Sequence, residues 1–211
     1  MKRLLCLFLL CGILVSFDGK APKVLLYIED GSVDLQYMLI HEVGKMRDIL
    51  KQSGFDVAVA TLSGEILKTD SITVTSDLKL REVNIDDYEG FILPCMANAD
   101  NDVTSVEKDF VKKIVNAGKP IAAQTGAIWI LAKAGVLNGK KFAFRFDATG
   151  HPDFENAIYG GRGVVQDGII ITSGTCPMIA KNTGNPDGTA KLTQTLIDAI
   201  KVKLNKHHSN K

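Results

Sequence analysis

Short apolar runs and amphipathic stretches alternate along the chain. Residues 24–28 and 55–60 are apolar runs with the length and composition of strands that are buried on both faces. Between them, apolar side chains recur at spacings of three or four, which predicts an amphipathic helix over residues 33–53. Gly54 fits the position just after the end of that helix. A strand, a helix and a second strand of this size predict a βαβ unit.

The alternation continues to the C-terminus. Thr104 and Glu107 have the spacing of a capping box at the start of a helix. Alternating strands and helices indicate an α/β domain, with a mostly parallel sheet that is covered by helices on both faces. Ligands of such sheets bind beyond the carboxyl ends of the strands, so we expect residues 29–32, 94–97 and 124–127 to meet at one rim. The other elements expected are strands at 72–75, 88–94, 121–123 and 141–145, a hairpin at 164–172, and helices at 104–117, 128–134 and 192–204.

A basic and then apolar segment precedes the first strand. Lys2 and Arg3 are followed by an apolar run at residues 4–15, which is the pattern of a secretory signal peptide. The run is shorter than the ~20 apolar residues of a membrane span, which leaves a retained anchor as the weaker alternative. Cleavage is expected between Ser16 and Ala21.

This segment sets the expected domain organisation. Attachment as a lipoprotein through Cys11 is disfavoured, because bulky leucines precede that cysteine where small residues are expected. We therefore expect residues 1–19 to be a signal peptide and residues 20–211 to form one domain. The mature protein would be periplasmic or secreted, without membrane attachment.

Composition and charge exclude several classes of function. The chain has 211 residues, of which 45% are hydrophobic and 23% charged, as in an ordinary globular domain. The formal net charge is +1 and no Lys/Arg run is present, so nucleic-acid binding is not expected. No metal-ligand spacing occurs apart from His207 and His208 in the tail, and we expect neither a metal nor a cofactor.

Residues 118–140, GKPIAAQTGAIWILAKAGVLNGK, carry a family resemblance. Together with the strand at 24–28, the GFDVAVA segment at 54–60 and the hairpin at 164–173, this stretch resembles the DJ-1/PfpI family, which is related to class I glutamine amidotransferases. The resemblance implies a flavodoxin-like three-layer α/β sandwich and a homodimer. It also implies that residues 121–127 form a strand-to-helix nucleophile elbow.

The chain departs from the family at the elbow and at the oxyanion loop. The elbow cysteine of the family is replaced by Thr125, between Gln124 and Gly126, and a hydroxyl needs a neighbouring base before it can act as a nucleophile. Where the family has two glycines, one of which supplies an oxyanion-hole N–H, this chain has Cys95 and Met96. The resemblance places all of these residues at the pocket.

The family's acid at the start of the first helix is also displaced. Matching forward from the first strand leads to Val33, and matching backward from Gly54 leads to Leu39, and neither is acidic. Glu29 and Glu42 are the nearest substitutes, although a solvated helix residue is the alternative interpretation of Glu42.

Two residues of the following loop are further candidates. Arg145 stands where many family members have His or Tyr, and this match places it at the pocket. His151 lies a few residues later. Its side chain either reaches the pocket as an acid–base group or is exposed in its loop.

Two cysteines remain after the signal segment. Cys95 lies at the oxyanion-loop position, and Cys176 matches a turn that borders the same pocket in the family. Three interpretations stay open: a disulfide, which an oxidising compartment would favour, a relocated nucleophilic or redox thiol at Cys95, or two unrelated buried cysteines.

The altered site predicts that the family's cysteine chemistry has been lost. The first hypothesis is a non-catalytic module that binds an unidentified small molecule or acts in stress. The second is a hydrolase-like or glyoxalase-like enzyme that uses Thr125 or Cys95 as nucleophile, with Glu29, Glu42 or His151 as acid–base groups.

Overall fold

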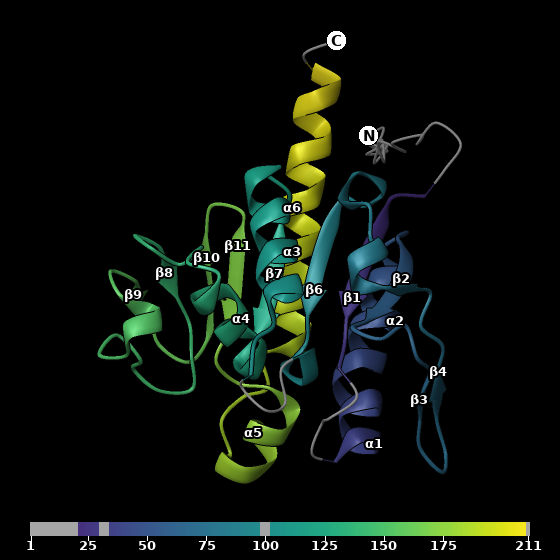
Figure 1. Ribbon diagram of the computed structural model, residues 1–211, viewed down its shortest axis with the longest axis horizontal. Coiled ribbons are helices and arrows are strands. Elements are labelled where there is room, and N and C mark those ends of the chain that lie inside the picture. Colours follow the sequence, from purple (N-terminus) through teal and green to yellow (C-terminus); the bar gives the residue numbers. More distant parts are fainter. Residues whose placement is uncertain (1–20, 30–33, 98–101, 210–211) are drawn as a thin grey trace, which may run out of the picture.

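The computed structural model describes residues 21–29, 34–97 and 102–209, with side chains described as far as residue 206. The predicted signal peptide lies outside these residues. A seven-stranded sheet forms the centre of the fold, in the order β10-β11-β7-β6-β1-β2-β5 (Figure 1). Every neighbouring pair is parallel except β10 and β11. Its strands are β1 (Lys23–Tyr27), β2 (Asp56–Thr61), β5 (Leu78–Lys79), β6 (Gly90–Leu93), β7 (Ile121–Gln124), β10 (Val164–Asp167) and β11 (Ile170–Ser173).

Helices cover both faces of this sheet. The main helical segments are α1 (Leu35–Met38), the π-helix η1 (Leu39–Gly44), α2 (Lys45–Gln52), α3 (Ser105–Asn116), α4 (Ile128–Lys133), α5 (Pro177–Thr183) and α6 (Thr189–Ser209). The 3₁₀ turns are η2 (Leu80–Glu82), η3 (Ile85–Asp87), η4 (Cys95–Ala97), η5 (Thr125–Ala127) and η6 (Pro152–Phe154). Two small strand pairs, β3 (Leu67–Lys68) with β4 (Thr73–Val74) and β8 (Lys141–Phe142) with β9 (Ile158–Tyr159), lie outside the main sheet.

Alternate side chains of the buried strands enter two separate cores. Leu25 and Phe91 belong to one core with residues of α3 and α4, such as Phe110. Leu26 and Ile92 point to the opposite face, where they share a second core with residues of α2 and α6. The three-layer α/β architecture expected from the alternation of elements is confirmed.

Local sequence signals explain most element boundaries. Gly54 follows α2 with a φ of 85°, and Gly168 turns the β10–β11 hairpin with a φ of 63°, conformations that glycine adopts without strain. The capping box of α3 is formed by Thr104 and Glu107. Glu107 is buried and also accepts a hydrogen bond of 2.8 Å from the Tyr27 hydroxyl, so the cap joins α3 to the central strand.

Parts of the structure differ from the pattern-based expectations, among them the unpredicted two-residue strands β3, β5 and β9. The helix expected over residues 33–53 contains the π-helical turn η1, which amphipathic spacing alone does not reveal. The strand expected over 141–145 ends at Phe142. Helix α5 was not predicted, although Pro177 at its start and Gly184 with a φ of 71° at its end are ordinary helix boundary signals.

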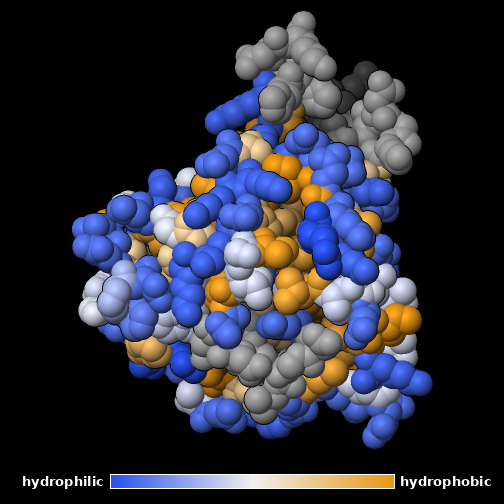
Figure 2. Space-filling model, in the orientation of Figure 1, coloured by the Kyte–Doolittle hydropathy of each residue, from blue (hydrophilic) through white to orange (hydrophobic). Residues whose placement is uncertain are grey.

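The carboxyl ends of β1, β6, β7 and β11 lie at one rim, at the same end of the molecule as α1 and α5 (Figure 1). The opposite end carries the C-terminal part of the long helix α6. On the face seen in Figure 2 the surface is mainly hydrophilic, with apolar side chains exposed in the middle of the face. Within the described ranges, no helix is both long and apolar enough to cross a membrane.

Candidate functional site

The rim brings together Glu29, the turns at 94–97 and 124–127 that the sequence predicted there, and a segment that follows β11; residues 30–32 of the first predicted segment lie outside the described residues. The backbone N–H of Glu29, after β1, donates to the Met96 carbonyl at 3.2 Å. The turns η4 and η5 continue directly from β6 and β7. After β11 the chain passes through Gly174, where a Cβ would stand 2.5 Å from the Phe144 carbonyl, and reaches Cys176. Glycine therefore permits the close approach that carries Cys176 to the rim.

Thr125 occupies a strained elbow. Its φ is 40°, in the left-handed region that β-branched residues avoid, and it lies between a strand and a helix. The side chain is buried, and its Oγ1 has no hydrogen-bond partner of good geometry. Backbone strain of this kind persists only where the surrounding structure enforces it. The elbow geometry has therefore been kept without the cysteine.

Glu42 is the buried acid of the site. It lies in the π-helix η1, is fully buried, and its Oε1 accepts a hydrogen bond of 2.8 Å from the N–H of Cys95. The other oxygen, Oε2, has no hydrogen-bond partner. Burial raises the pKa of this carboxyl well above its usual value, and the negative charge of the Cys176 thiolate adds to the effect. The interpretation of Glu42 as a solvated helix residue is therefore wrong, and burial favours the protonated form of its carboxyl.

Cys95 and Cys176 lie together as two free thiols. The Cys95 thiol donates toward Cys176, and this interaction is the largest cause that lowers the pKa of Cys176 from 9.0 to about 6. The Thr125 side chain and the backbone N–H groups of Ile179 and Met178 lower it further, against the effect of burial. The pKa of Cys95 is raised by the same contact, by burial and by Glu42. Cys176 is therefore the thiolate of the pair.

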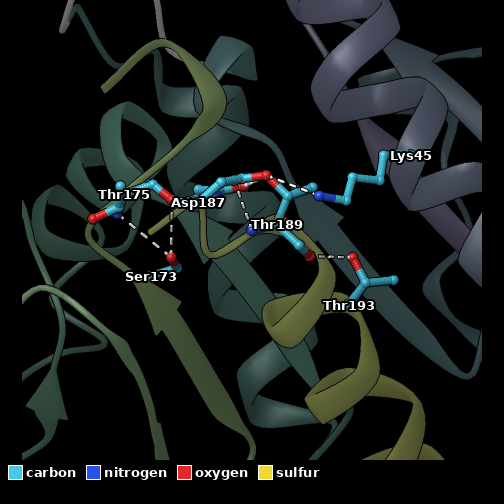
Figure 3. A network of polar contacts seen from close by, with 7 residues as sticks. Lys45, Ser173, Thr175, Asp187, Thr189 and Thr193 are labelled. Atoms are coloured by element: carbon cyan, nitrogen blue, oxygen red, sulfur yellow. Dashed lines mark hydrogen bonds and ion pairs between the residues drawn. The ribbon is translucent and has the colours of Figure 1, made fainter. Parts of the chain in front are cut away.

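A polar network fixes the segment that precedes and follows Cys176 (Figure 3). Buried Gln124 donates from Nε2 to the Thr175 carbonyl at 2.7 Å, and its Oε1 accepts from Thr189 at 3.3 Å. Asp187 accepts from the Thr189 hydroxyl at 2.6 Å and pairs with Lys45 of α2 at 3.0 Å. Gln124, which was predicted as a pocket residue, therefore positions Cys176 by binding the backbone carbonyl of the preceding residue, Thr175.

The remaining predicted residues divide between the rim and the surface. Met96 is buried, and its N–H lies beside the Glu42 carboxyl together with that of Cys95. Gly126 is half-buried in the elbow turn.

The two candidates of the loop after β8 lie at the surface. Arg145 is exposed, and its guanidinium stacks 5.2 Å from the ring centroid of Phe146. His151 is also exposed; its Nδ1 accepts from the Asp153 N–H at 3.2 Å, and its ring packs edge-on against Trp129. The structure thus gives both residues contacts within their own region and none with the thiols.

Sequence reasoning placed Cys176 at the pocket but did not identify it as the ionised thiol. The signal available was the Cys-Pro step, since a proline at the first helical turn marks the preceding residue as an N-cap with free N–H groups ahead of it. In the described part of the chain, no group of three or more His, Cys, Asp or Glu side chains could hold a metal ion.

Comparison with known proteins identifies the family. The model of the DJ-1/PfpI family matches residues 22–181, which include Glu42, Cys95, Thr125 and Cys176. The chain belongs to the DJ-1/PfpI family. The resemblance inferred from residues 118–140 is confirmed. The elbow threonine and the Cys95–Cys176 pair are thus features of a DJ-1/PfpI domain.

Relatives of known sequence share moderate identity with this family member. A deglycase of Thermococcus kodakarensis is 35% identical over 122 residues, which are 56% of this chain and 69% of that protein. A deglycase of Pyrococcus abyssi is 37% identical over 95 residues, 44% of this chain and 57% of that protein. Protein dj-1beta of Drosophila melanogaster is 26% identical over 163 residues, 72% of this chain and 81% of that protein.

Solved structures confirm the flavodoxin-like α/β fold. A ThiJ/PfpI domain protein from Brachyspira murdochii matches with a TM-score of 0.69 at 15% identity, covering 87% of this chain and 99% of that chain. The structure of Drosophila melanogaster DJ-1beta matches with a TM-score of 0.58 at 22% identity, covering 86% of this chain and 98% of that chain.

Proposed function

We propose that this DJ-1/PfpI protein is a thiol-dependent enzyme whose nucleophile is Cys176 rather than the elbow residue Thr125. The observation that carries the proposal is the convergence of the Cys176 sulfur, the Cys95 thiol and the buried Glu42 carboxyl at the carboxyl ends of the strands. A thiolate needs no further base, in contrast to the threonine hydroxyl. This proposal replaces the expected nucleophiles, Thr125 and Cys95, by a third residue.

The groups present suit addition to a small carbonyl compound. The Cys176 thiolate would attack the carbonyl carbon, and the electron pair of the C=O bond would move to the oxygen. Glu42 would then donate its proton to that oxygen, since its Oε2 has no other partner. The relatives named deglycases support carbonyl-derived compounds as the substrate class. Complete burial of Cys176 restricts the substrate to a small molecule.

Turnover of a 2-oxoaldehyde such as methylglyoxal by the reduced protein tests the proposal. We expect Cys176→Ser to lower kcat/KM by at least ~100-fold, because a serine hydroxyl is not ionised at neutral pH. Thr125→Ala is the matched control at the elbow, and it should keep kcat/KM within about 10-fold of the wild type. Loss of activity in the elbow variant with retention in Cys176→Ser would contradict the assignment.

A non-catalytic ligand-binding module is the second candidate, and one observation favours it. The N–H of Cys95, at the family's oxyanion position, already donates to Glu42 and so is not directed at a substrate. On this hypothesis, no 2-oxoaldehyde is consumed by the wild type, yet small carbonyl compounds or carboxylates raise its melting temperature.

We further propose that the chain is exported and that the mature protein is a homodimer. The apolar N-terminal run supports export, and the family resemblance supports the dimer. Fractionation of cells that express the full chain, with N-terminal sequencing of the product, tests the first proposal. Sedimentation of the mature protein tests the second. A cytoplasmic product that retains residue 1, or a monomer at micromolar concentration, would contradict them.

A further inference from the structure

Cys95 and Cys176 can react with each other, in addition to acting as a hydrogen-bond donor and a nucleophile. Cys95 begins the turn after β6, and Cys176 precedes α5, so both follow the carboxyl ends of parallel strands. They are far apart in sequence, but Cys176 lies in the apolar core on one face of the sheet and Cys95 packs against that same core, where its thiol donates toward Cys176; both are reduced. Neither stands at the elbow. The arrangement therefore holds a second thiol against the thiolate, independently of any carbonyl substrate.

We propose that this pair reduces hydroperoxides, with Cys176 as the attacking thiol and Cys95 as the resolving thiol that closes a disulfide. The proposal rests on the proposed function only in assigning the reactive thiolate to Cys176. Disulfide formation requires the two cysteines and not a carbonyl-binding pocket.

The first step is a two-electron oxidation of Cys176. Its thiolate attacks the terminal oxygen of the hydroperoxide, an S–O bond forms and the O–O bond breaks. The sulfur becomes a sulfenic acid, and the hydroperoxide is reduced to an alcohol, or to water when it is hydrogen peroxide. The leaving oxygen takes a proton, and the Glu42 carboxyl, whose protonated form is favoured by burial, is the buried acid beside the thiolate that can supply it.

The second step joins the two cysteines. The Cys95 sulfur attacks the sulfenic sulfur of Cys176, an S–S bond forms and the S–O bond breaks. The oxygen leaves as water with the sulfenic hydrogen and the proton of the Cys95 thiol. A further turnover needs an external dithiol, which reduces the disulfide by thiol–disulfide exchange and is itself oxidised.

The electrostatics of the site assign the two roles. Cys176 carries the negative charge, and a thiolate is the form that attacks peroxide. Cys95 stays protonated beside it, because the neighbouring thiolate and burial both raise its pKa. The chain around Cys176 is held by the bond from Gln124 to the Thr175 carbonyl and by the Thr189–Asp187 contact of Figure 3, so Cys176 is fixed while Cys95 lies in a short turn.

The experiment uses the full chain carrying Cys6→Ser and Cys11→Ser, so that only the two site cysteines remain. Stoichiometric hydrogen peroxide is added, and intact mass and peptide mapping follow the product. We expect loss of two hydrogen atoms and a cross-linked peptide pair that contains Cys95 and Cys176. Cys95→Ser should stop at the sulfenic acid, one oxygen heavier and trapped by dimedone. Cys176→Ser should react with peroxide at least ~10-fold more slowly.

Two results would overturn the inference. One is the absence of the cross-linked peptide pair from the oxidised protein. The other is peroxide consumption at equal rates by the Cys176→Ser variant and the parent protein. Methylglyoxal turnover by the reduced protein is measured in parallel, so that the two proposals fail separately. A disulfide without carbonyl turnover leaves this inference standing, and turnover without a disulfide leaves only the proposed function.

Discussion

Replacing Cys95 with alanine should raise the pKa of Cys176. The Cys95 thiol is the largest cause that brings the pKa of Cys176 down to about 6, and alanine cannot donate. A hydrogen bond to a charged acceptor contributes about 1.5–3 kcal/mol, and about 1.4 kcal/mol corresponds to one pKa unit. We therefore expect the pKa of Cys176 in Cys95→Ala to rise to about 7–8.

The ultraviolet absorbance of the thiolate measures this change, because no reagent has to reach the buried sulfur. Subtracting the titration of Cys176→Ser from that of the wild type isolates Cys176 from the other cysteines. Cys95→Ser is the matched control, since its hydroxyl can still donate to the thiolate, and its midpoint should lie between those of the wild type and Cys95→Ala. A wild-type midpoint near the usual thiol value, or identical midpoints in wild type and Cys95→Ala, would refute the reasoning.

The same low pKa links folding stability to pH. Since the folded pKa of Cys176 lies below the unfolded value, its contribution is complete only above the unfolded pKa and is lost as the pH falls through about 6. A difference of about three pKa units corresponds to about 4 kcal/mol above pH ~9, of which about 1.4 kcal/mol remains near pH ~7. Denaturant unfolding of the wild type and Cys176→Ser across this range should show the difference shrinking toward acid.

Three further predictions concern the elements around the site. The wild type should lose folding stability as the pH rises above the usual glutamate pKa, because the pKa of Glu42 is raised in the folded state, and Glu42→Gln should remove this loss. Urea unfolding of the wild type and of Glu42→Gln at about pH 5 and pH 8 measures the difference. The same change in stability with pH in both proteins would contradict the prediction. The free energy of unfolding of Thr125→Gly should lie within about 1 kcal/mol of the wild-type value, because relief of about 1–2 kcal/mol of left-handed backbone strain offsets the lost burial. Thr172→Gly in β11, where the backbone is not left-handed, should lower the free energy of unfolding by more than about 2 kcal/mol. Tyr27→Phe should lower the free energy of unfolding by about 1–3 kcal/mol, because the buried Glu107 oxygen loses the hydrogen bond from the Tyr27 hydroxyl. Tyr88→Phe is the control, since the Tyr88 hydroxyl makes no such bond to Glu107, and it should unfold at nearly the wild-type urea concentration.

The sheet could be predicted from the sequence because each buried strand is a continuous apolar run next to a turn signal. The runs at 24–28, 55–60 and 121–123 became β1, β2 and β7 within a residue or two. The capping box of α3 was equally readable, since its two residues are local. What local pattern did not give were the two-residue strands β5 and β9, because so short a segment has no recognisable apolar run and its pairing partner is distant in sequence.

The candidate site was predicted less completely, for a physical reason. The rim segments follow from strand order, and the resemblance brought Cys95, Thr125 and Cys176 to that rim. Which thiol ionises depends on the direction of one hydrogen bond and on the burial of Glu42, which no spacing in the sequence encodes. The resemblance placed Arg145 at the pocket, and His151 was expected either to reach it or to be exposed. In the structure both side chains are exposed, Arg145 stacked on Phe146 and His151 against Trp129.

The π-helical turn η1 has a consequence for how this chain is compared with its relatives. An added residue inside a helix turns every following side chain by about 100°, unless a wider turn absorbs it locally. In this chain the family acid matches Val33 when counted forward from the first strand and Leu39 when counted backward from Gly54. The carboxyl that accepts the N–H of Cys95 belongs instead to Glu42, within η1. An insertion can thus be hidden inside an element rather than in a loop. A site that lacks a residue when sequences are matched position by position can therefore still hold an equivalent side chain in the folded protein.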